Sequence, residues 1–210
     1  MLTSLLFELT TQVQQLVAPA INEYSLLHNS TLLSLPTLAL SAGKWHPLAL
    51  PGSSGSTAEI RLTIPLTVAA ASVSIAVLAA ADVTRAADAL NVIVDVPARA
   101  GTGPRNATLT ITNEHAPPNL NTKASAVSTF TVLADESEVD VQIFIDRVVV
   151  EAFAMGGRGA VVAEEYVNFF PPHNRTAVHM LSHAGDIVLQ EVTVFAMGCG
   201  WAAPEGRWVE

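Results

Sequence analysis

Residues Glu138-Val-Asp-Val-Gln-Ile-Phe-Ile-Asp146 decide the fold class of this 210-residue chain. The purely aliphatic residues of this stretch occupy every second position: Val139, Val141, Ile143 and Ile145. A period of two is typical of a β-strand that buries one face, because successive side chains of a strand point to opposite sides. We therefore predict a half-buried strand. Its other face carries Asp140, Gln142, Phe144 and Asp146.

Two turn signals follow this strand. Asp146-Arg147 is suited to turning the chain, and Gly156-Gly157 supplies the positive φ angles that a second tight turn needs. The segment between them is rich in β-branched residues, so the sequence predicts a three-stranded antiparallel meander. Glu151 and Arg158 flank the second turn, and we expect them to form an ion pair across adjacent strands rather than to contact a ligand.

Further β-branched or alternating runs extend in both directions, and most are bounded by turn-forming residues. They are Glu59–Thr67, Ser72–Leu78, Asn91–Val96, Ala107–Thr112, Ser128–Leu133, Val148–Phe153, Ala160–Val162, Ala177–Leu181 and Ile187–Phe195. Many short strands separated by Gly- and Pro-containing loops indicate an all-β fold, a two-layer antiparallel β-sandwich of the jelly-roll or concanavalin-like kind. We assign residues 29–201 to this sandwich, residues 1–28 to a lead-in with a helical turn after Pro19, and residues 202–210 to a tail.

The composition excludes several classes of protein. Half of the residues are hydrophobic and 14% are charged, which favours a packed globule over a disordered chain. A net charge of -9 argues against nucleic acid as a partner, because phosphate backbones are bound by clustered Lys and Arg. The single cysteine, Cys199, rules out an internal disulfide and a zinc site built from several cysteines. The uncharged stretch Leu62–Ala81 contains Pro65, Ser and Thr, so we predict no membrane span there.

The stretch from Val141 to Arg158 resembles the signature of the C-terminal β-sandwich of glycoside hydrolase family 32, which includes invertases, inulinases and fructanases. In that signature an Asp between two strands precedes Val-Glu-x-Phe, and Gly-Arg follows the Phe after three intervening residues. The matching residues stand at the same spacing: Asp146, Val150, Glu151, Phe153, Gly157 and Arg158, with Gly156 beside them. Val148 occupies the position where the family usually has a serine.

The resemblance extends towards both ends of the chain. Gln14–Leu27 resembles the linker through which the family's chain leaves its catalytic propeller, although His28 stands where the family has an arginine. Ile187–Met197 resembles the family's last strand, with Phe195 at the usual position of a tryptophan. The resemblance therefore implies that an N-terminal five-bladed propeller precedes this type of domain.

The resemblance implies that catalysis takes place in that propeller, where one carboxylate attacks a fructoside and a second donates a proton. Those carboxylates belong to Asn-Asp-Pro and Glu-Cys motifs, beside an Arg-Asp-Pro motif, and none of the three occurs in this sequence. We therefore expect a non-catalytic module that is inactive alone, flanks or stabilises a propeller in cis or in trans, and needs no cofactor. The domain would be extracellular or vacuolar where the full-length protein carries an upstream signal.

Two other functions remain open. A stand-alone carbohydrate-binding module would bind fructan or a sucrose-type sugar, with Trp45, Trp201 and Trp208 as stacking residues, although packing is the expectation we favour for these side chains. An adhesive or structural sandwich would bind a protein instead. In the propeller-packing role, we expect an edge of the sandwich to be available for forming a homo-oligomer. Three Asn-x-Ser/Thr sequons provide glycosylation sites on secretion: Asn29, Asn106 and Asn174.

Neither of the two candidate metal sites is expected to bind metal. His179 and His183 have the spacing of zinc ligands on a helix, but their surroundings predict a strand that ends in a turn. The acidic run from Asp135 to Asp140 lacks the spacing and the central glycine of a calcium loop, so we expect a solvated turn. Glu164 and Glu165 are adjacent and would point to opposite faces of a strand, which excludes them as a catalytic pair.

Overall fold

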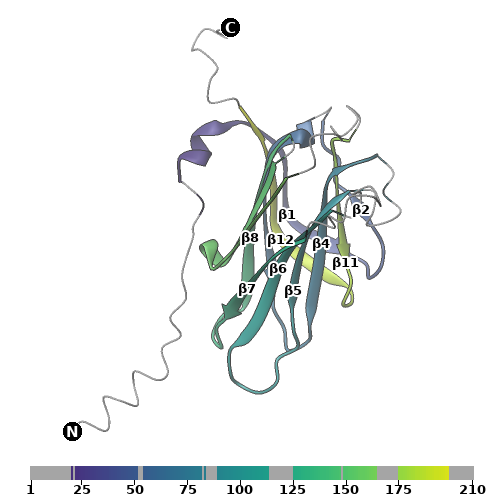
Figure 1. Cartoon of the computed structure of the whole chain (residues 1–210). Coiled ribbons are helices and arrows are strands. Elements are labelled where there is room, and N and C mark those ends of the chain that lie inside the picture. Colours follow the sequence, from purple (N-terminus) through teal and green to yellow (C-terminus); the bar gives the residue numbers. More distant parts are fainter. Residues whose placement is uncertain are drawn as a thin grey trace, which may run out of the picture.

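The computed structural model describes residues 20, 22–51, 54–81, 83, 89–113, 125–147, 149–164 and 175–198. These residues form two six-stranded antiparallel sheets that pack face to face (Figure 1). Short 3₁₀ segments accompany the strands: η1 (Asn22–Leu27), η2 (Ser54–Ser56) and η4 (Met155–Gly157). The predicted two-layer all-β architecture is therefore confirmed.

The first sheet, sheet A, has the strand order β1-β12-β3-β8-β9-β10. Its strands are β1 (His28–Leu40), β12 (Ile187–Met197), β3 (Thr57–Pro65), β8 (Glu138–Asp146), β9 (Val149–Ala154) and β10 (Gly159–Glu164). Three of them, β8, β9 and β10, are consecutive in the chain and pair as neighbours. The meander predicted from the turn signals is thus confirmed.

The second sheet, sheet B, has the strand order β2-β11-β4-β5-β6-β7. Its strands are β2 (His46–Pro47), β11 (Ala177–Ser182), β4 (Ala71–Ala79), β5 (Leu90–Val96), β6 (Arg105–Asn113) and β7 (Ser125–Val132). Consecutive hairpins join β4 to β7, and β11 returns from the far end of the chain to pair with β4.

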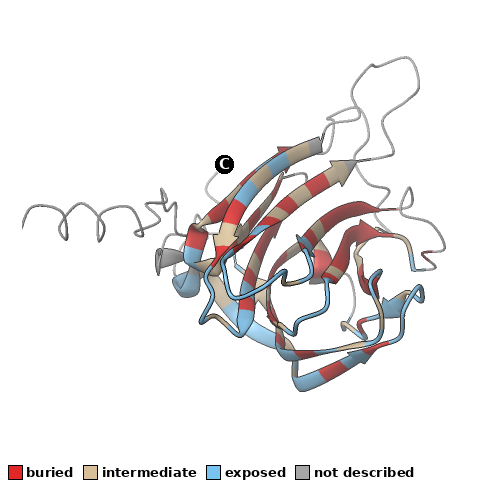
Figure 2. Cartoon of the chain, turned by 90° about the horizontal axis from the view of Figure 1, so that it is seen from below, coloured by how far each residue is buried: buried red, intermediate tan, exposed pale blue. Residues whose placement is uncertain are grey.

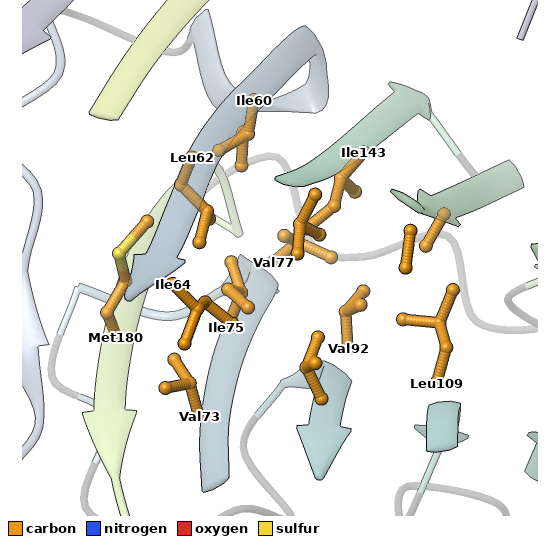
Figure 3. Close-up of a cluster of buried hydrophobic side chains, with 14 of the residues drawn as sticks. Ile60, Leu62, Ile64, Val73, Ile75, Val77, Val92, Leu109, Ile143 and Met180 are labelled. Atoms are coloured by element: carbon orange, nitrogen blue, oxygen red, sulfur yellow. The ribbon is translucent and has the colours of Figure 1, made fainter. Parts of the chain in front are cut away.

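The core lies between the two sheets and is built from the alternation that the sequence predicted. Along β8 the exposure alternates, with Val139, Val141, Ile143 and Ile145 buried towards sheet B. Buried and exposed residues alternate along many strands (Figure 2). Side chains from both sheets interdigitate (Figure 3), among them Ile60, Leu62, Ile75, Val92, Leu109 and Met180. Burial of each such side chain contributes about 1.5–3 kcal/mol to folding, so this single core accounts for the two-layer arrangement.

The stretch considered for a membrane span contains strands. Leu62–Ala81 comprises the end of β3, a loop after Pro65, and all of β4. Its apolar character reflects burial between the sheets, because every side chain of β4 except that of Ser72 is buried. No helix within the described ranges has the length and apolarity required to cross a bilayer.

The longest strand was not predicted. β1 is a 13-residue strand that begins at His28, where the lead-in was expected to meet the sandwich, and it contains Pro36. A proline removes one backbone donor and is tolerated in a strand at the edge of a sheet. β1 occupies such an edge of sheet A, with β12 as its neighbour. The η1 segment before it agrees with the helical turn expected after Pro19.

Candidate functional site on the outer face of sheet A

Strand β3 directs Glu59 away from the core. Its neighbours Ala58 and Ile60 point inward to the core, so Glu59 and Arg61 lie on the outer face of sheet A. The register places Glu59 between Phe195 of β12 and Phe144 of β8. Although it lies on an outer face, Glu59 is fully buried at 0% exposure. A buried carboxylate requires compensating donors, since an unpaired one would be costly.

Three side chains supply those donors. His28 Nε2 contacts Glu59 Oε2, and Arg61 Nε donates to Glu59 Oε1. Gln142 Nε2 donates a third hydrogen bond of 2.6 Å to the same Oε1. We call these four residues and Phe195 the Glu59 cluster. Both carboxylate oxygens are thus held by donors from β1, β3 and β8, so the cluster ties together three separate strands.

The aromatic ring of Phe195 contacts two other residues of the cluster. The ring of His28 stacks on that of Phe195 with a centroid separation of 4.1 Å and an interplanar angle of 5°. The guanidinium carbon of Arg61 lies 5.5 Å from the same ring centroid, within the range of a cation–π contact. Phe195 therefore positions two of the groups that bind Glu59.

The electrostatics of the cluster oppose acid–base chemistry. Burial by itself raises the pKa of Glu59, but the hydrogen bonds from Arg61, His28 and Gln142, with the charge of Arg61, hold that pKa below its ordinary value. A general acid at neutral pH needs a raised pKa, and a nucleophile needs access to the substrate. Glu59 has neither property, so the cluster is a structural feature of the sheet.

Most of the motif residues lie in the two turns of the meander. After Asp146, Arg147 takes a positive φ of 56° and its amide donates to Ser56 O at 2.7 Å. At the second turn Gly156 has a φ of 60°, and its amide donates a 3.0 Å hydrogen bond to Asp140 Oδ2. Gly157 has a φ of 92°, as expected for a glycine turn.

Arg158 closes the second turn, but with a partner other than the one predicted. Its guanidinium forms an ion pair with Glu136 and donates to Thr131 O at 2.9 Å. Glu151 instead stands opposite Val162, four residues beyond Arg158 and hence about 13 Å along the strand. The partner that the structure gives Arg158 is Glu136, and the expected pair of Glu151 and Arg158 stays a prediction. Glu136 holds Arg158, and also accepts a bond from the amide of Leu133.

Comparison with known proteins identifies the family of this domain. The family described as "Glycosyl hydrolases family 32 C terminal" matches residues 23–196, which include η1 from its second residue, the Glu59 cluster and the whole meander. The chain belongs to this family. A search of curated proteins found no match.

Solved structures share the fold of this family 32 domain. Fructan 1-exohydrolase IIa from Cichorium intybus is similar with a TM-score of 0.73 and 14% identity, over 88% of this chain and 38% of that one. A fructosyltransferase from A. japonicus has a TM-score of 0.60 and 17% identity, over 94% and 34%. An exo-inulinase from Aspergillus awamori has a TM-score of 0.57 and 18% identity, over 87% and 33%. The chain thus spans between a third and two fifths of these proteins.

Val150 of the motif lies in the core, whereas Glu151 and Phe153 lie on the outer face of sheet A. Glu151 stands between Phe144 and Val162 in the register and is half-buried. Phe153 packs edge-on against Phe144, with ring centroids 6.0 Å apart. The motif therefore has two effects: it builds two turns, and it places Glu151 and Phe153 on one surface.

The acidic run and the two histidines have structural partners. Glu136 and Asp140 hold Arg158 and the Gly156 amide, as described, while Asp135 and Glu138 are exposed. His179 lies within β11 and donates to Ala80 O at 3.1 Å. His183 follows β11, as the predicted strand and turn require, and hydrogen-bonds Ser74 Oγ at 2.7 Å. Across the described ranges no three His, Cys, Asp or Glu side chains gather as metal ligands would.

The remaining candidates are dispersed. Trp45 packs against a small cluster of buried side chains on the outside of sheet B, which includes Ala76, Ala79 and Ala89. Asn29 in β1 and Asn106 in β6 are exposed, so both sequons lie at the surface. Cys199, Asn174, Glu165, Trp201 and Trp208 lie outside the described residues. Of the three tryptophan candidates, the described part of the chain thus contains Trp45 alone.

The Glu59 cluster was missed in the sequence, although one signal for it was present. The alternation from Ala58 to Ile64 places Glu59 and Arg61 on the same outer face, two residues apart. His28 and Gln142 are 31 and 83 residues away from Glu59 along the chain. Only the sheet order brings these donors together, so their pairing could not be predicted from local patterns.

Proposed function

We propose that this chain is the non-catalytic accessory sandwich of a β-fructofuranosidase-like glycoside hydrolase, and that its role is to pack against and stabilise a catalytic propeller. The observation that carries the proposal is the chemical state of Glu59. Among the described residues it is the one buried carboxylate, and donors occupy both of its oxygens. A family 32 domain without a free, activated carboxylate in its described part is suited to packing rather than to hydrolysis.

Two further points support the proposal. The family matched by residues 23–196 is defined as a C-terminal part of glycosyl hydrolases, and the chain spans only 33–38% of the enzymes compared above. The remainder of an enzyme of that length would supply the propeller. Interfaces between domains of one chain commonly bury about 600–1,500 Å², which one face of a six-stranded sheet can provide.

The test is to mix the purified chain with an isolated propeller domain, prepared from the Cichorium intybus exohydrolase by deleting its C-terminal part. We expect a stoichiometric complex in size-exclusion chromatography with light scattering, a higher Tm of the propeller, and greater hydrolysis of sucrose or inulin than by the propeller alone. The chain by itself should hydrolyse neither sugar. If the two proteins stay separate and the propeller's Tm and activity are unchanged, the proposal is wrong.

The same purified chain also tests the alternative function, that of a carbohydrate-binding module. Isothermal titration of the chain alone with inulin, sucrose and kestose should give no saturable heat if its role is packing. Saturable binding without a propeller would instead assign the chain to carbohydrate recognition. Capture of a protein partner that is not a glycoside hydrolase, with no sugar response, would favour a structural sandwich.

A further inference from the structure

A buried arginine closes one end of the sandwich. Arg105 is the first residue of β6 and pairs with Val132 of the core, so its side chain points between the two sheets. The residue is only 5% exposed. Its Nη1 atom donates to Thr67 O and to Pro97 O, both at 3.2 Å. These carbonyls belong to the loops that follow β3 and β5, so Arg105 joins two loops at this end of the molecule.

A second arginine lies beside the first. The amide of Arg99 donates to Val68 O at 2.8 Å, and Val68 follows Thr67, which Arg105 binds. Burial, and to a smaller extent the positive charge of Arg99, holds the pKa of Arg105 below its ordinary value. Arginine nevertheless remains protonated at physiological pH. Two like charges therefore lie together where solvation by water is poor.

Neither arginine has an acidic partner. The chain contains 19 Asp and Glu residues against ten Lys and Arg, yet none of the acids in the described ranges forms an ion pair with Arg99 or Arg105. The Nε atoms of both arginines are buried without a hydrogen-bond partner. A buried donor without an acceptor is destabilising, and more so when its group is charged. Ordered water can accept such a bond, but it carries no negative charge.

The free donors of Arg105 have the geometry of an anion site. Two backbone carbonyls occupy Nη1, which leaves Nε and Nη2 along one edge of the guanidinium. The N–H groups of this edge are parallel, and with them arginine binds two oxygens of one phosphate or carboxylate. Because Thr67 O and Pro97 O hold the plane of the guanidinium, the edge is oriented before a ligand binds.

The loop that joins the two arginines leaves room for a ligand. Residues 100–104 are all exposed. A Cβ atom at Gly101 or Gly103 would meet no atom within 4 Å, so open space lies beside the loop. Arg99 directly precedes this loop and is half-buried. A small anion can therefore approach the two guanidiniums from the side of Arg99.

We propose that Arg99 and Arg105 form a binding site for a phosphate dianion, either inorganic phosphate or the phosphate group of a phosphorylated sugar. A phosphate monoester carries a charge of about -1.5 to -2 at pH 7 and three strong acceptor oxygens, so it balances both guanidiniums. A carboxylate would balance only one. The phosphate oxygens accept hydrogen bonds from the free edge of Arg105 and from the guanidinium of Arg99. This site goes beyond the proposed function, because it needs no propeller.

Arg99→Gln and Arg147→Gln are a matched pair of variants for the test. R99Q removes the more accessible arginine and leaves Arg105 to close the sandwich. Arg147 is exposed and follows the last residue of β8, whereas the loop with Thr67 begins where β3 pairs with the first residue of β8. R147Q therefore removes the same charge at the opposite end of the molecule. Arg99→Lys is the conservative variant, which keeps the charge but not the planar fork.

Isothermal titration of the whole chain at pH 7 measures binding of two probes, inorganic phosphate and fructose 6-phosphate, with fructose and KCl as controls. We expect saturable binding of both probes, but not of fructose, to the parent chain and to R147Q. R99Q should raise Kd by about tenfold or more, because it removes charge-assisted hydrogen bonds, and R99K should lie between R99Q and the parent. Equal Kd values for the two probes would support inorganic phosphate as the ligand, and a lower Kd for fructose 6-phosphate would support a sugar phosphate.

Thermal unfolding separates ligand binding from a purely structural role of Arg99. Without phosphate, R99Q should be at least as stable as the parent, because the repulsion between the two guanidiniums is removed. With phosphate, the Tm of the parent and of R147Q should rise and that of R99Q should not. A Tm of R99Q that lies below the parent's by the same amount with and without phosphate would assign Arg99 to the fold alone and overturn the proposal. Absence of saturable binding of both probes, or a rise in Tm that KCl at equal ionic strength reproduces, would overturn it too.

Discussion

Gly159 lies directly against the ring of Phe130. A Cβ atom at Gly159 would come within 2.7 Å of Phe130 Cδ1, a distance too short for any side chain. Gly159 begins β10 in sheet A, and Phe130 belongs to β7 in sheet B. The amide of Ala160 also donates to Ser128 Oγ at 3.3 Å. The absence of a side chain at Gly159 therefore lets the Phe130 ring of sheet B pack directly against the backbone of β10 in sheet A.

This contact predicts that Gly159→Ala destabilises the sandwich by about 1–3 kcal/mol, the usual range for an added group in a packed core. Phe130 is 1% exposed, so its ring lies in the packed core. Urea unfolding followed by tryptophan fluorescence or circular dichroism measures the change. The double variant with Phe130→Leu should show non-additive energetics, because the second change removes the clashing ring atoms.

Gly103→Ala is the matched control for that experiment. Gly103 lies in a loop, and a Cβ there would meet no atom within 4 Å. The alanine should leave stability unchanged or raise it by a few tenths of a kcal/mol, up to about 1. Equal losses from both substitutions would mean that backbone flexibility, and not the contact with Phe130, accounts for the effect.

The ion pair at the second turn gives a second prediction. Arg158→Met removes the bonds to Glu136 and Thr131 O, and we expect a loss of about 1–3 kcal/mol in unfolding free energy. Glu136→Gln should cost less, since the amide retains one acceptor oxygen. A double-mutant cycle between the two positions should give a coupling of at least about 0.5 kcal/mol. Additive losses would show that the two side chains act independently.

The fold was largely predictable because local patterns and the global structure agree in the meander. Val139, Ile143 and their neighbours alternate, and Gly156 and Gly157 mark a turn that only φ-positive residues suit. β1 was missed for a physical reason: its leucine-rich sequence with Pro36 lacks the β-branched pattern of a central strand. Its place at the edge of sheet A tolerates both features.

The contacts of the motif residues were less predictable than the motif itself. Arg158 was expected to meet Glu151 because both flank one turn, but pairing depends on the register and on a third element. Glu136 reaches Arg158 from the loop between β7 and β8, 22 residues earlier in the chain. The Glu59 cluster shows the same limit, since its donors come from three strands. Sequence patterns predict which face a side chain takes, whereas the order of strands decides its partner.

Trp45 gives a third prediction, which separates packing from sugar stacking. Trp45→Ala should lower the free energy of unfolding by about 2 kcal/mol, because the indole covers the small residues Ala76, Ala79 and Ala89. Addition of fructo-oligosaccharides should shift the Tm of neither the parent nor the variant. A sugar-dependent rise in Tm for the parent chain that Trp45→Ala abolishes would instead assign the indole to sugar binding.

The last prediction concerns the pH dependence of the Glu59 cluster. Donors in the folded chain hold the pKa of Glu59 below its ordinary value of 4.5, which applies in the unfolded chain. The unfolded state therefore binds a proton more readily, and the ionised carboxylate stabilises the fold fully above pH 4.5. That contribution is lost as the pH falls below 4.5 and through the lower pKa of the folded state.

Glu59→Gln tests this directly, because it keeps the shape of the side chain but cannot ionise. At pH 7 we expect it to cost about 1–3 kcal/mol, since the amide offers one acceptor where the carboxylate satisfies three donors. The difference in unfolding free energy between parent and variant should shrink as the pH falls below 4.5, measured by urea unfolding between pH 7 and pH 3. The control is Glu138→Gln on the neighbouring strand β8, where the side chain is exposed. A parent–variant difference for Glu59 that stays constant over this range would show that the charge of the carboxylate contributes nothing and that its shape alone fills the site.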